Sequence, residues 1–359
     1  SSLVAAHLCR LRPPEQVQTF SMALDDPAYD ESRWSRWAAR LLGTTHHELR
    51  LEPGRLIGTI DSVLDNLDEP MSDSSIIPTH AIAALTRQHV PAAFAGDAGD
   101  EMFGGYPKYF AHRWAALLQH VPAVVRRWCL ERPLRLLPSP DGSVLLGQNK
   151  IAAFFRGIDR HYALRNQFWV SAFLPEQLEE LTGTPLLDGT LEPVLRRADE
   201  YRGPDDIVTK AMFLDFKLLL LDGNNVKTDR AGALAGLELR EPFMDTAMIE
   251  LAARIPSRLK VKGMCTKYLT KRLAERYYPR DFVYRKKWGF GIPIKRWIRD
   301  ALRPRFEAAF APDAVRRAGL VNPDVCARLL REHLAGRASY AGQLWALYVL
   351  QHWRRTWGV

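Results

Sequence analysis

The alternation of strand-like and helix-like segments over the first hundred residues constrains the fold more than any other feature of this sequence. Residues 16–24 and 45–51 combine apolar and β-branched residues as strands do, and residues 30–43 have the periodicity of a helix. Asp30 is placed to cap that helix, and Gly43 lies just beyond its end. This β-α-β succession predicts a mostly parallel sheet that helices cover on both faces.

The same pattern continues along the chain and then gives way to helices. Residues 78–89 predict a helix with a proline at its start, and residues 90–96 predict a short apolar strand. Farther on, strand signals fade, and helical segments separated by Pro and Gly run to the end of the sequence. We therefore predict an α/β fold, with a core over residues 1–110 and a largely helical region over residues 111–359.

Both ends of the sequence predict helices. Ser1 and Ser2 suit the N-cap position, and the largely apolar residues 3–8 continue as a helix. Residues 339–359 place apolar side chains at helical spacing and carry basic residues near their end, which suit a helix C-terminus. A packed terminal helix is therefore favoured over a helix that lies on a membrane surface.

Composition argues against several classes of protein. No apolar stretch approaches the ~18 residues of a membrane span, and no signal segment opens the sequence, so we expect a cytoplasmic protein without a membrane partner. The four cysteines lie far apart without a C-x-x-C pair, which argues against a disulfide framework or a zinc site. The net charge of +9 makes nucleic acid a candidate partner, but the basic residues are dispersed and match no nucleic-acid-binding signature, which disfavours such binding.

An acidic, glycine-rich loop follows the last predicted strand. In residues 95–106 (AGDAGDEMFGGY), three carboxylates, Asp97, Asp100 and Glu101, lie within five residues. Ligands bind beyond the carboxyl ends of parallel strands, and clustered carboxylates repel one another unless a cation shares them. Magnesium bridging to phosphate oxygens would suit this loop, and a solvated acidic turn would account for the same residues without a ligand.

Charged residues recur in the second half of the sequence. Residues 222–245 begin like a calcium loop, but a lysine stands at the sixth position and an alanine at the twelfth, which excludes an EF-hand. The charged side chains of this segment lie among apolar residues, so they must pair with one another or hold a charged substrate. Two groups of basic residues follow in the sequence. Lys267 lies on a predicted helix, and a second group before a glycine-flanked turn comprises Arg285, Lys286 and Lys287. Both groups could contact triphosphate or pyrophosphate.

Together these segments resemble the synthetase domain of the glutamine-hydrolysing asparagine synthases. The resemblance covers nearly the whole sequence, and only about residues 111–205 match weakly. Its motifs occur in one order: TFSMALDDPAYDES, LGTTHHEL, DEPMSDSSIIPT, GDAGDEMFGGYPKY, VKTDRAGALAGLELREPFMD, TKYLTKRL, RKKWGFGIP and LWALYVLQHW. The resemblance implies an ATP-pyrophosphatase core of the adenine nucleotide alpha hydrolase type.

The resemblance also bears on how the sequence opens. The family's phosphate-binding loop reads S-G-G-x-D-S-S before a helix, and Ser1 and Ser2 resemble its last two serines. It therefore implies that this sequence begins inside that loop, as a fragment of a longer enzyme. A glutaminase domain would lie upstream and supply ammonia from glutamine, and a homodimer is compatible with the resemblance.

The reaction that the resemblance implies is the ATP-dependent amidation of a carboxylate, normally that of aspartate. The carboxylate attacks the α-phosphorus of ATP to form an acyl-adenylate and pyrophosphate, and ammonia then displaces AMP. The implied cofactors are ATP and Mg²⁺. Motif matching gives the site residues: Asp97 for the amidation step, Lys267 for charge on phosphate and adenylate, Asp100 for magnesium, and Ser1, Ser2, Ser21, Met22, Gly96 and Lys287 for ATP.

Two departures from the family pattern leave the acceptor open. Ala95 stands where serine is usual, and Ala98 replaces the glycine of GDGGDE. Such a paralogue could amidate a sugar acid, a peptide carboxylate or an amino acid that cyclises to a lactam. The sequence is also compatible with a tRNA-modifying ATP pyrophosphatase or a non-catalytic homologue. His46 and His47 are interpreted as packing or surface residues, and Glu238, Arg240 and Asp245 as an internal ion network.

Overall fold

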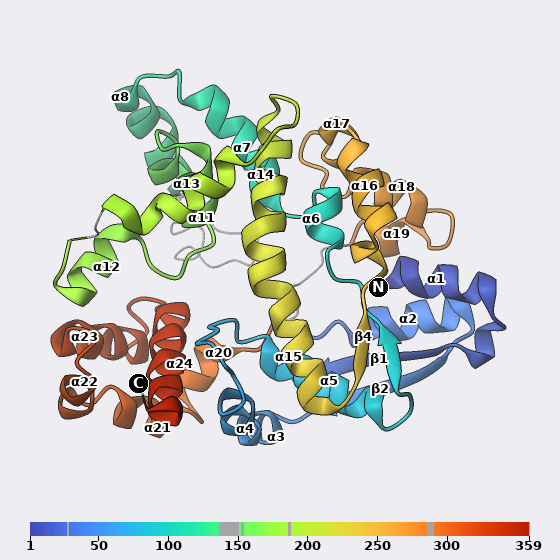
Figure 1. The fold of residues 1–359 in the computed structure, drawn as a ribbon, viewed down its shortest axis with the longest axis horizontal. Coiled ribbons are helices and arrows are strands. Elements are labelled where there is room, and N and C mark those ends of the chain that lie inside the picture. The colour runs from blue at the N-terminus through green and yellow to red at the C-terminus, as the bar shows by residue number, and fades with distance from the viewer. Residues whose placement is uncertain (27–28, 136–150, 152–153, 186–187, 286–290, 359) are drawn as a thin grey trace. The chain divides into compact units, whose positions relative to one another are not determined.

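The computed structural model describes residues 1–26, 29–135, 151, 154–185, 188–285 and 291–358. It divides into two compact units, each assembled from separate stretches of the chain (Figure 1). The first comprises residues 1–98, 221–249 and 270–359, and the second comprises residues 99–220 and 250–269. The sequence-based boundary at residue 110 stays a prediction.

The first unit contains all the described strands. Its elements are α1 (Ser2–Leu11), η1 (Pro14–Gln16), β1 (Gln18–Leu24), α2 (Ser32–Leu42), β2 (Thr45–Leu51), α3 (Pro53–Gly58), α4 (Ile60–Leu64), α5 (Ile76–Arg87), β3 (Ala92–Phe94), α15 (Asn225–Ala235), β4 (Glu238–Arg240), η5 (Pro242–Met244), α19 (Arg280–Val283), α20 (Ile294–Arg299), α21 (Arg303–Ala309), α22 (Pro312–Ala318), α23 (Pro323–Leu334) and α24 (Ala341–Trp357).

The predicted parallel pairing is confirmed for β1 and β2. Their register runs from Gln18 opposite Thr45 to Leu24 opposite Leu51. Between them α2 ends where Gly43 adopts φ +74°, as its C-cap position requires. Asp30 lies one residue before the N-cap, and its carboxylate accepts hydrogen bonds from the backbone N–H of Ser32 at 3.1 Å and of Leu24 at 3.3 Å. It therefore ties the end of β1 to the start of α2.

A second parallel pair joins β3 to β4, a strand that the sequence did not predict. Ala92 lies opposite Glu238 and Phe94 opposite Arg240, and the Ala95 N–H extends the pairing to the Arg240 carbonyl at 2.8 Å. The described strands form two separate two-stranded sheets. Because β4 has only three residues and its partner lies far away in sequence, it leaves no local periodicity to detect.

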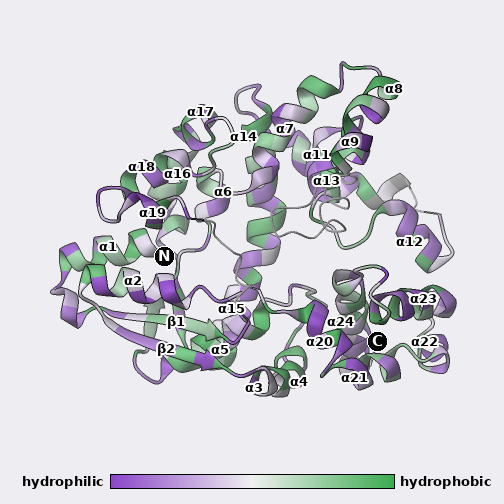
Figure 2. Cartoon of the chain, turned by 180° about the vertical axis from the view of Figure 1, so that it is seen from behind, coloured by the Kyte–Doolittle hydropathy of each residue, from purple (hydrophilic) through white to green (hydrophobic). Residues whose placement is uncertain are grey.

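The terminal helix α24 is packed, as predicted. Its buried face includes Leu344, Trp345 and Leu347, and His352 Nε2 lies 2.7 Å from a carboxylate oxygen of Asp65. Figure 2 shows green and purple residues interspersed along the helices. Among the described residues, we find no helix long and apolar enough to cross a membrane.

The second unit is helical. Its elements are α6 (Gly99–Phe103), α7 (Pro107–Leu118), α8 (Ala123–Val125), η2 (Arg126–Glu131), α9 (Arg132–Arg135), α11 (Tyr162–Phe168), α12 (Pro175–Thr182), η3 (Asp188–Leu191), α13 (Glu192–Asp199), α14 (Ile207–Leu214) and α17 (Ser257–Lys260). Part of its core is the cluster of Tyr109, Val208, Ala211, Met212 and Val261. Three helices continue from one unit into the other: η4 (Asp215–Asn224), α16 (Thr246–Arg254) and α18 (Tyr268–Ala274).

Candidate functional site

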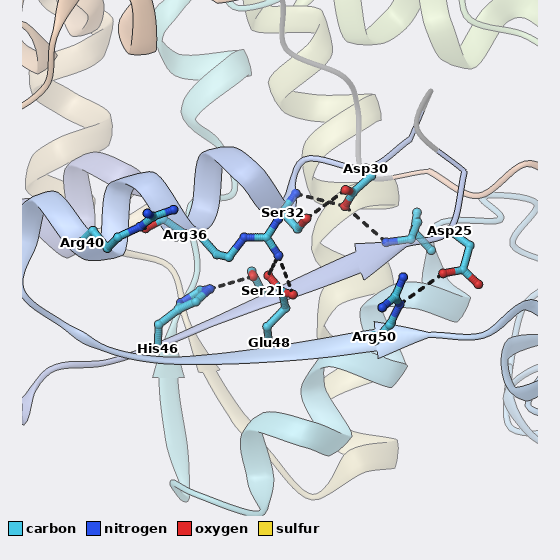
Figure 3. Close-up of polar contacts among 10 residues, drawn as sticks. Ser21, Asp25, Asp30, Ser32, Arg36, Arg40, His46, Glu48 and Arg50 are labelled. Carbon is cyan, nitrogen blue, oxygen red and sulfur yellow. Dashed lines mark hydrogen bonds and ion pairs between the residues drawn. The ribbon is translucent and has the colours of Figure 1, made fainter.

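Ser21 and Met22, two of the predicted ATP-binding residues, are neighbours on β1. Ser21 Oγ lies 3.0 Å from His46 Nε2 (Figure 3). The other ring nitrogen of His46 lies 3.0 Å from Thr19 Oγ1. His46 is thus a partly buried residue that contacts β1 through polar atoms, which agrees with its interpretation as a packing or surface residue. Strand alternation turns the side chains of Ser21 and Met22 to opposite faces, so a ligand on the Ser21 face would meet only the backbone of Met22.

Ser1 and Gly96, two predicted ATP-binding residues, lie against each other. A Cβ atom added to Gly96 would overlap the backbone nitrogen and Cα of Ser1, so only glycine permits this approach. Ser2 is anchored from another element, because the hydroxyl of Tyr278 donates to its carbonyl at 2.7 Å. Tyr278 itself is 3% exposed and packs with Ala6 and Phe282. Two segments that are distant in sequence therefore contact the start of α1.

The acidic loop contains a strained position at Ala98. Ala98 is buried and has φ +66°, in the left-handed region that favours glycine. This is the position where the sequence departs from the family's glycine, and the alanine keeps the glycine-like backbone. Asp97, the predicted amidation residue, precedes it and is partly exposed. The chain passes from the first unit to the second directly after Ala98.

Asp100 and Lys267 form an ion pair in the second unit. Lys267 Nζ lies 2.9 Å from Asp100 Oδ1, and the side chains are 25% and 34% exposed, respectively. Gly105 lies against both, since a Cβ there would overlap the Asp100 carboxylate and Lys267 Cε. Two residues that are distant in sequence and were predicted for the same site are thus brought together.

The backbone of Lys267 is itself unusual. Lys267 has φ +53°, and its N–H donates to the carbonyl of Gly104 at 3.1 Å. Lys267 and Ala98 are the two non-glycine residues with positive φ in the described part of the chain. The predicted helical position of Lys267 is wrong, because α18 begins one residue later. A left-handed residue with a long side chain costs about 1–2 kcal/mol, and such strain clusters at functional sites.

The third carboxylate of the loop, Glu101, turns inward. It is 3% exposed and accepts a hydrogen bond from the hydroxyl of Tyr106 at 2.5 Å. Burial raises the pKa of Glu101 above its ordinary value, and the charges of Asp100 and Asp215 add to the rise. The three carboxylates of this loop therefore do not form one cation-binding cluster. Among the described residues, no group of three His, Cys, Asp or Glu side chains could hold a metal ion.

Several charged residues of the 222–245 segment form ion pairs with one another or with upstream carboxylates. Lys227 Nζ lies 3.1 Å from Asp73 Oδ2, and Arg230 forms an ion pair with Asp68. The interpretation of an internal network at Glu238, Arg240 and Asp245 is wrong, because all three are exposed. Arg240 pairs with Glu238 on the surface, and Asp245 accepts from the N–H of Ala247. Lys286 and Lys287 lie outside the described residues.

A buried polar network in the second unit escaped the sequence analysis. Lys108 Nζ lies 2.6 Å from Asp215 Oδ1, with side chains 9% and 2% exposed. Asn166 donates to the same oxygen at 2.7 Å, and its own carbonyl oxygen lies 3.0 Å from His112 Nε2. Burial is the largest cause that lowers the pKa of His112 to about 3, so its ring is neutral at neutral pH. In such a network each polar group is the hydrogen-bond or ion-pair partner of another, so the loss of one member leaves a neighbour buried without that partner.

Comparison with known proteins places the chain in a family. The sequence profile of asparagine synthase matches residues 1–355. The chain belongs to the asparagine synthase family. This confirms the resemblance drawn from the motifs, and the match includes the weakly similar stretch from 111 to 205.

The curated relatives are all named as asparagine synthetases. The chain is 22% identical over 337 residues to asparagine synthetase [glutamine-hydrolyzing] 1 of Bacillus subtilis (strain 168), covering 94% of this chain and 52% of that protein. It is 26% identical over 354 residues to a putative asparagine synthetase [glutamine-hydrolyzing] of Mycobacterium bovis, covering 98% and 52%. A protein with the same name in Mycobacterium tuberculosis (strain H37Rv) gives the same values. The chain spans about half the length of these relatives.

Proposed function

We propose that this protein is an ATP-dependent carbon–nitrogen ligase that converts aspartate to asparagine through an acyl-adenylate. The observation that carries the proposal is the Asp100–Lys267 ion pair, held at 2.9 Å against Gly105. Its members come from GDAGDEMFGGY and TKYLTKRL, two motifs that carried the family resemblance. We further propose that β1 and β2 belong to an ATP-pyrophosphatase core and that glutamine is the nitrogen donor; the second proposal is supported by relatives that are named as glutamine-hydrolysing.

In the first step, an oxygen of the substrate carboxylate forms a bond to the α-phosphorus of ATP while the bond to the β-phosphate oxygen breaks. Pyrophosphate leaves with the electron pair of that bond. Two anions must approach, so a fixed cation lowers the barrier by stabilising the charge that develops on the α-phosphate. Lys267 would supply this cation, because its backbone conformation and the carboxylate of Asp100 fix the direction of its side chain.

In the second step, ammonia attacks the carbonyl carbon of the adenylate, and the bond to AMP breaks. The nitrogen must lose a proton as the amide forms, which calls for a general base. We propose Asp97 for this role, since it is partly exposed in the loop after β3. For the nucleotide we propose Ser1, Ser2, Ser21, Met22 and Gly96, with Lys287 as a pyrophosphate contact.

The residues at Asp100 suit a magnesium ion that takes few of its ligands from the protein. The ion usually takes one or two protein carboxylates and completes its shell with water and phosphate oxygens, so no cluster of three protein ligands is required. Asp100 would hold it, because its carboxylate is 34% exposed and the ion pair with the ammonium of Lys267 is formed by one of its oxygens, Oδ1. When bound, the ion would neutralise charge on the phosphates of ATP.

Product stoichiometry tests this proposal. The protein purified from its own cells should form asparagine, AMP and pyrophosphate in equal amounts from aspartate, ATP and glutamine, and it should form no ADP. Equal amounts of AMP and pyrophosphate with a sugar acid or a peptide instead of aspartate would move the proposal to another acceptor. An absence of AMP formation with every carboxylate in a broad panel would support a non-catalytic role.

A further inference from the structure

Asp100 and its neighbour in the sequence, Glu101, point in different directions. Asp100 and Glu101 are consecutive residues of α6, a helix of five residues, and consecutive helical side chains point about 100° apart. Glu101 is buried, whereas Asp100 is partly exposed and contacts Lys267. If Glu101 turned outward, α6 would rotate and Asp100 would turn away from Lys267.

A helix as short as α6 has no stable orientation of its own, so contacts with residues outside the helix must fix it. Tyr106 provides one of them, because its hydroxyl donates to Glu101 Oε1 at 2.5 Å. Gly105 provides another, with its N–H donating to the Asp100 carbonyl at 2.7 Å. Met102 and Phe103 are buried and add apolar packing on the inner side.

Tyr106 is in turn fixed by the next helix. It occupies the N-cap position of α7, and two residues later Lys108 forms the buried ion pair with Asp215 at 2.6 Å. The ammonium of Lys108 also lies 5.6 Å from the centroid of the Tyr106 ring, within cation–π range. The phenol that holds Glu101 is therefore attached to the buried polar network of the second unit.

We propose that the Tyr106–Glu101 hydrogen bond positions the Asp100 carboxylate for the metal–nucleotide complex. Tyr106 is then a positioning residue, which acts through Glu101 and α6 and does not touch the substrate. The inference rests on the role proposed for Asp100. Removing a hydrogen bond that orients a metal-binding residue commonly weakens metal binding by about 10- to 100-fold.

Metal affinity in the native protein tests this inference, with Mn²⁺ as the probe in the presence of α,β-methylene ATP. Binding is followed by the loss of the free Mn²⁺ signal in electron paramagnetic resonance, which requires no turnover. Tyr106→Phe removes only the hydroxyl and is expected to weaken Mn²⁺ binding about tenfold. Glu101→Gln keeps an acceptor for Tyr106 and should bind within about twofold of the unmodified protein, whereas Glu101→Leu should match Tyr106→Phe.

Two further variants sharpen the result. Tyr106→Phe combined with Glu101→Leu should bind no more weakly than either single variant, because both remove the same bond. Tyr268→Phe is the matched control, because it also removes a tyrosine hydroxyl in the second unit. It should leave Mn²⁺ binding unchanged. Circular dichroism checks that each variant is folded.

Unchanged Mn²⁺ binding in folded Tyr106→Phe would overturn the inference. So would an equal loss in Glu101→Gln and Glu101→Leu, because that result would assign the effect to the charge of Glu101. Failure of the proposed function gives a different pattern: Asp100→Ala would then bind Mn²⁺ as well as the unmodified protein, and no amide product would form.

Discussion

Replacing Lys267 by methionine is expected to abolish most of the synthetase activity, with kcat for amide formation falling about 10²- to 10³-fold. Methionine keeps an unbranched side chain of similar length but removes the ammonium that lies 2.9 Å from Asp100 Oδ1. The loss arises because this ammonium would no longer stabilise the charge that develops on the α-phosphate. Initial rates of AMP formation at saturating ATP and aspartate measure the effect.

Lys271→Met is the control for this experiment. Lys271 lies on α18, one turn beyond Lys267, and its ammonium lies over the ring of Tyr284. It should retain nearly full activity. A loss of less than tenfold in Lys267→Met would show that the ammonium has no direct part in the chemistry, and the Asp100–Lys267 pair would then be structural.

Replacing Asp215 by alanine is expected to destabilise the protein by about 3–5 kcal/mol. The substitution leaves the ammonium of Lys108 buried at 9% exposure without its carboxylate and also removes the acceptor of Asn166. An uncompensated buried charge is much more costly than the loss of an exposed ion pair. Urea denaturation followed by tryptophan fluorescence measures the free energy of unfolding.

Two companion variants identify the cause of this loss. Lys108→Met combined with Asp215→Leu removes both charges and should recover much of the stability, because buried ion pairs can often be replaced by apolar residues of similar size. Glu250→Ala removes one partner of the exposed pair with Arg254 and should have no measurable effect. A loss of under 1 kcal/mol in Asp215→Ala would contradict the view that the buried ammonium of Lys108 needs the carboxylate of Asp215.

The sequence could predict the elements whose signals are local. β2 and α2 were found because an alternating strand and a helix ending at Gly43 each carry their own pattern. Contacts between residues that are distant in sequence leave no such local pattern. β4 is three residues long and pairs with a strand far away in sequence, and the Lys108–Asp215 pair joins residues 107 positions apart.

In the candidate site, too, some features could be predicted from the sequence and others could not. Asp100 and Lys267 were predicted because their motifs matched a family, and the structure then brought them together. The inward turn of Glu101 was not predictable from the loop's composition, because three neighbouring carboxylates look alike until burial distinguishes them. The left-handed backbone of Ala98 is likewise visible only in three dimensions, although the family's glycine at that place hinted at it.

Isotope transfer from the carboxylate to AMP tests the central claim most directly. The protein purified from its own cells is incubated with ATP, a nitrogen donor and aspartate that carries ¹⁸O in its side-chain carboxylate, and the products are analysed by mass spectrometry. An acyl-adenylate requires one ¹⁸O atom to leave with AMP and the other to stay in the amide of asparagine. Unlabelled AMP, or ¹⁸O in inorganic phosphate accompanied by ADP, would contradict adenylation of the carboxylate.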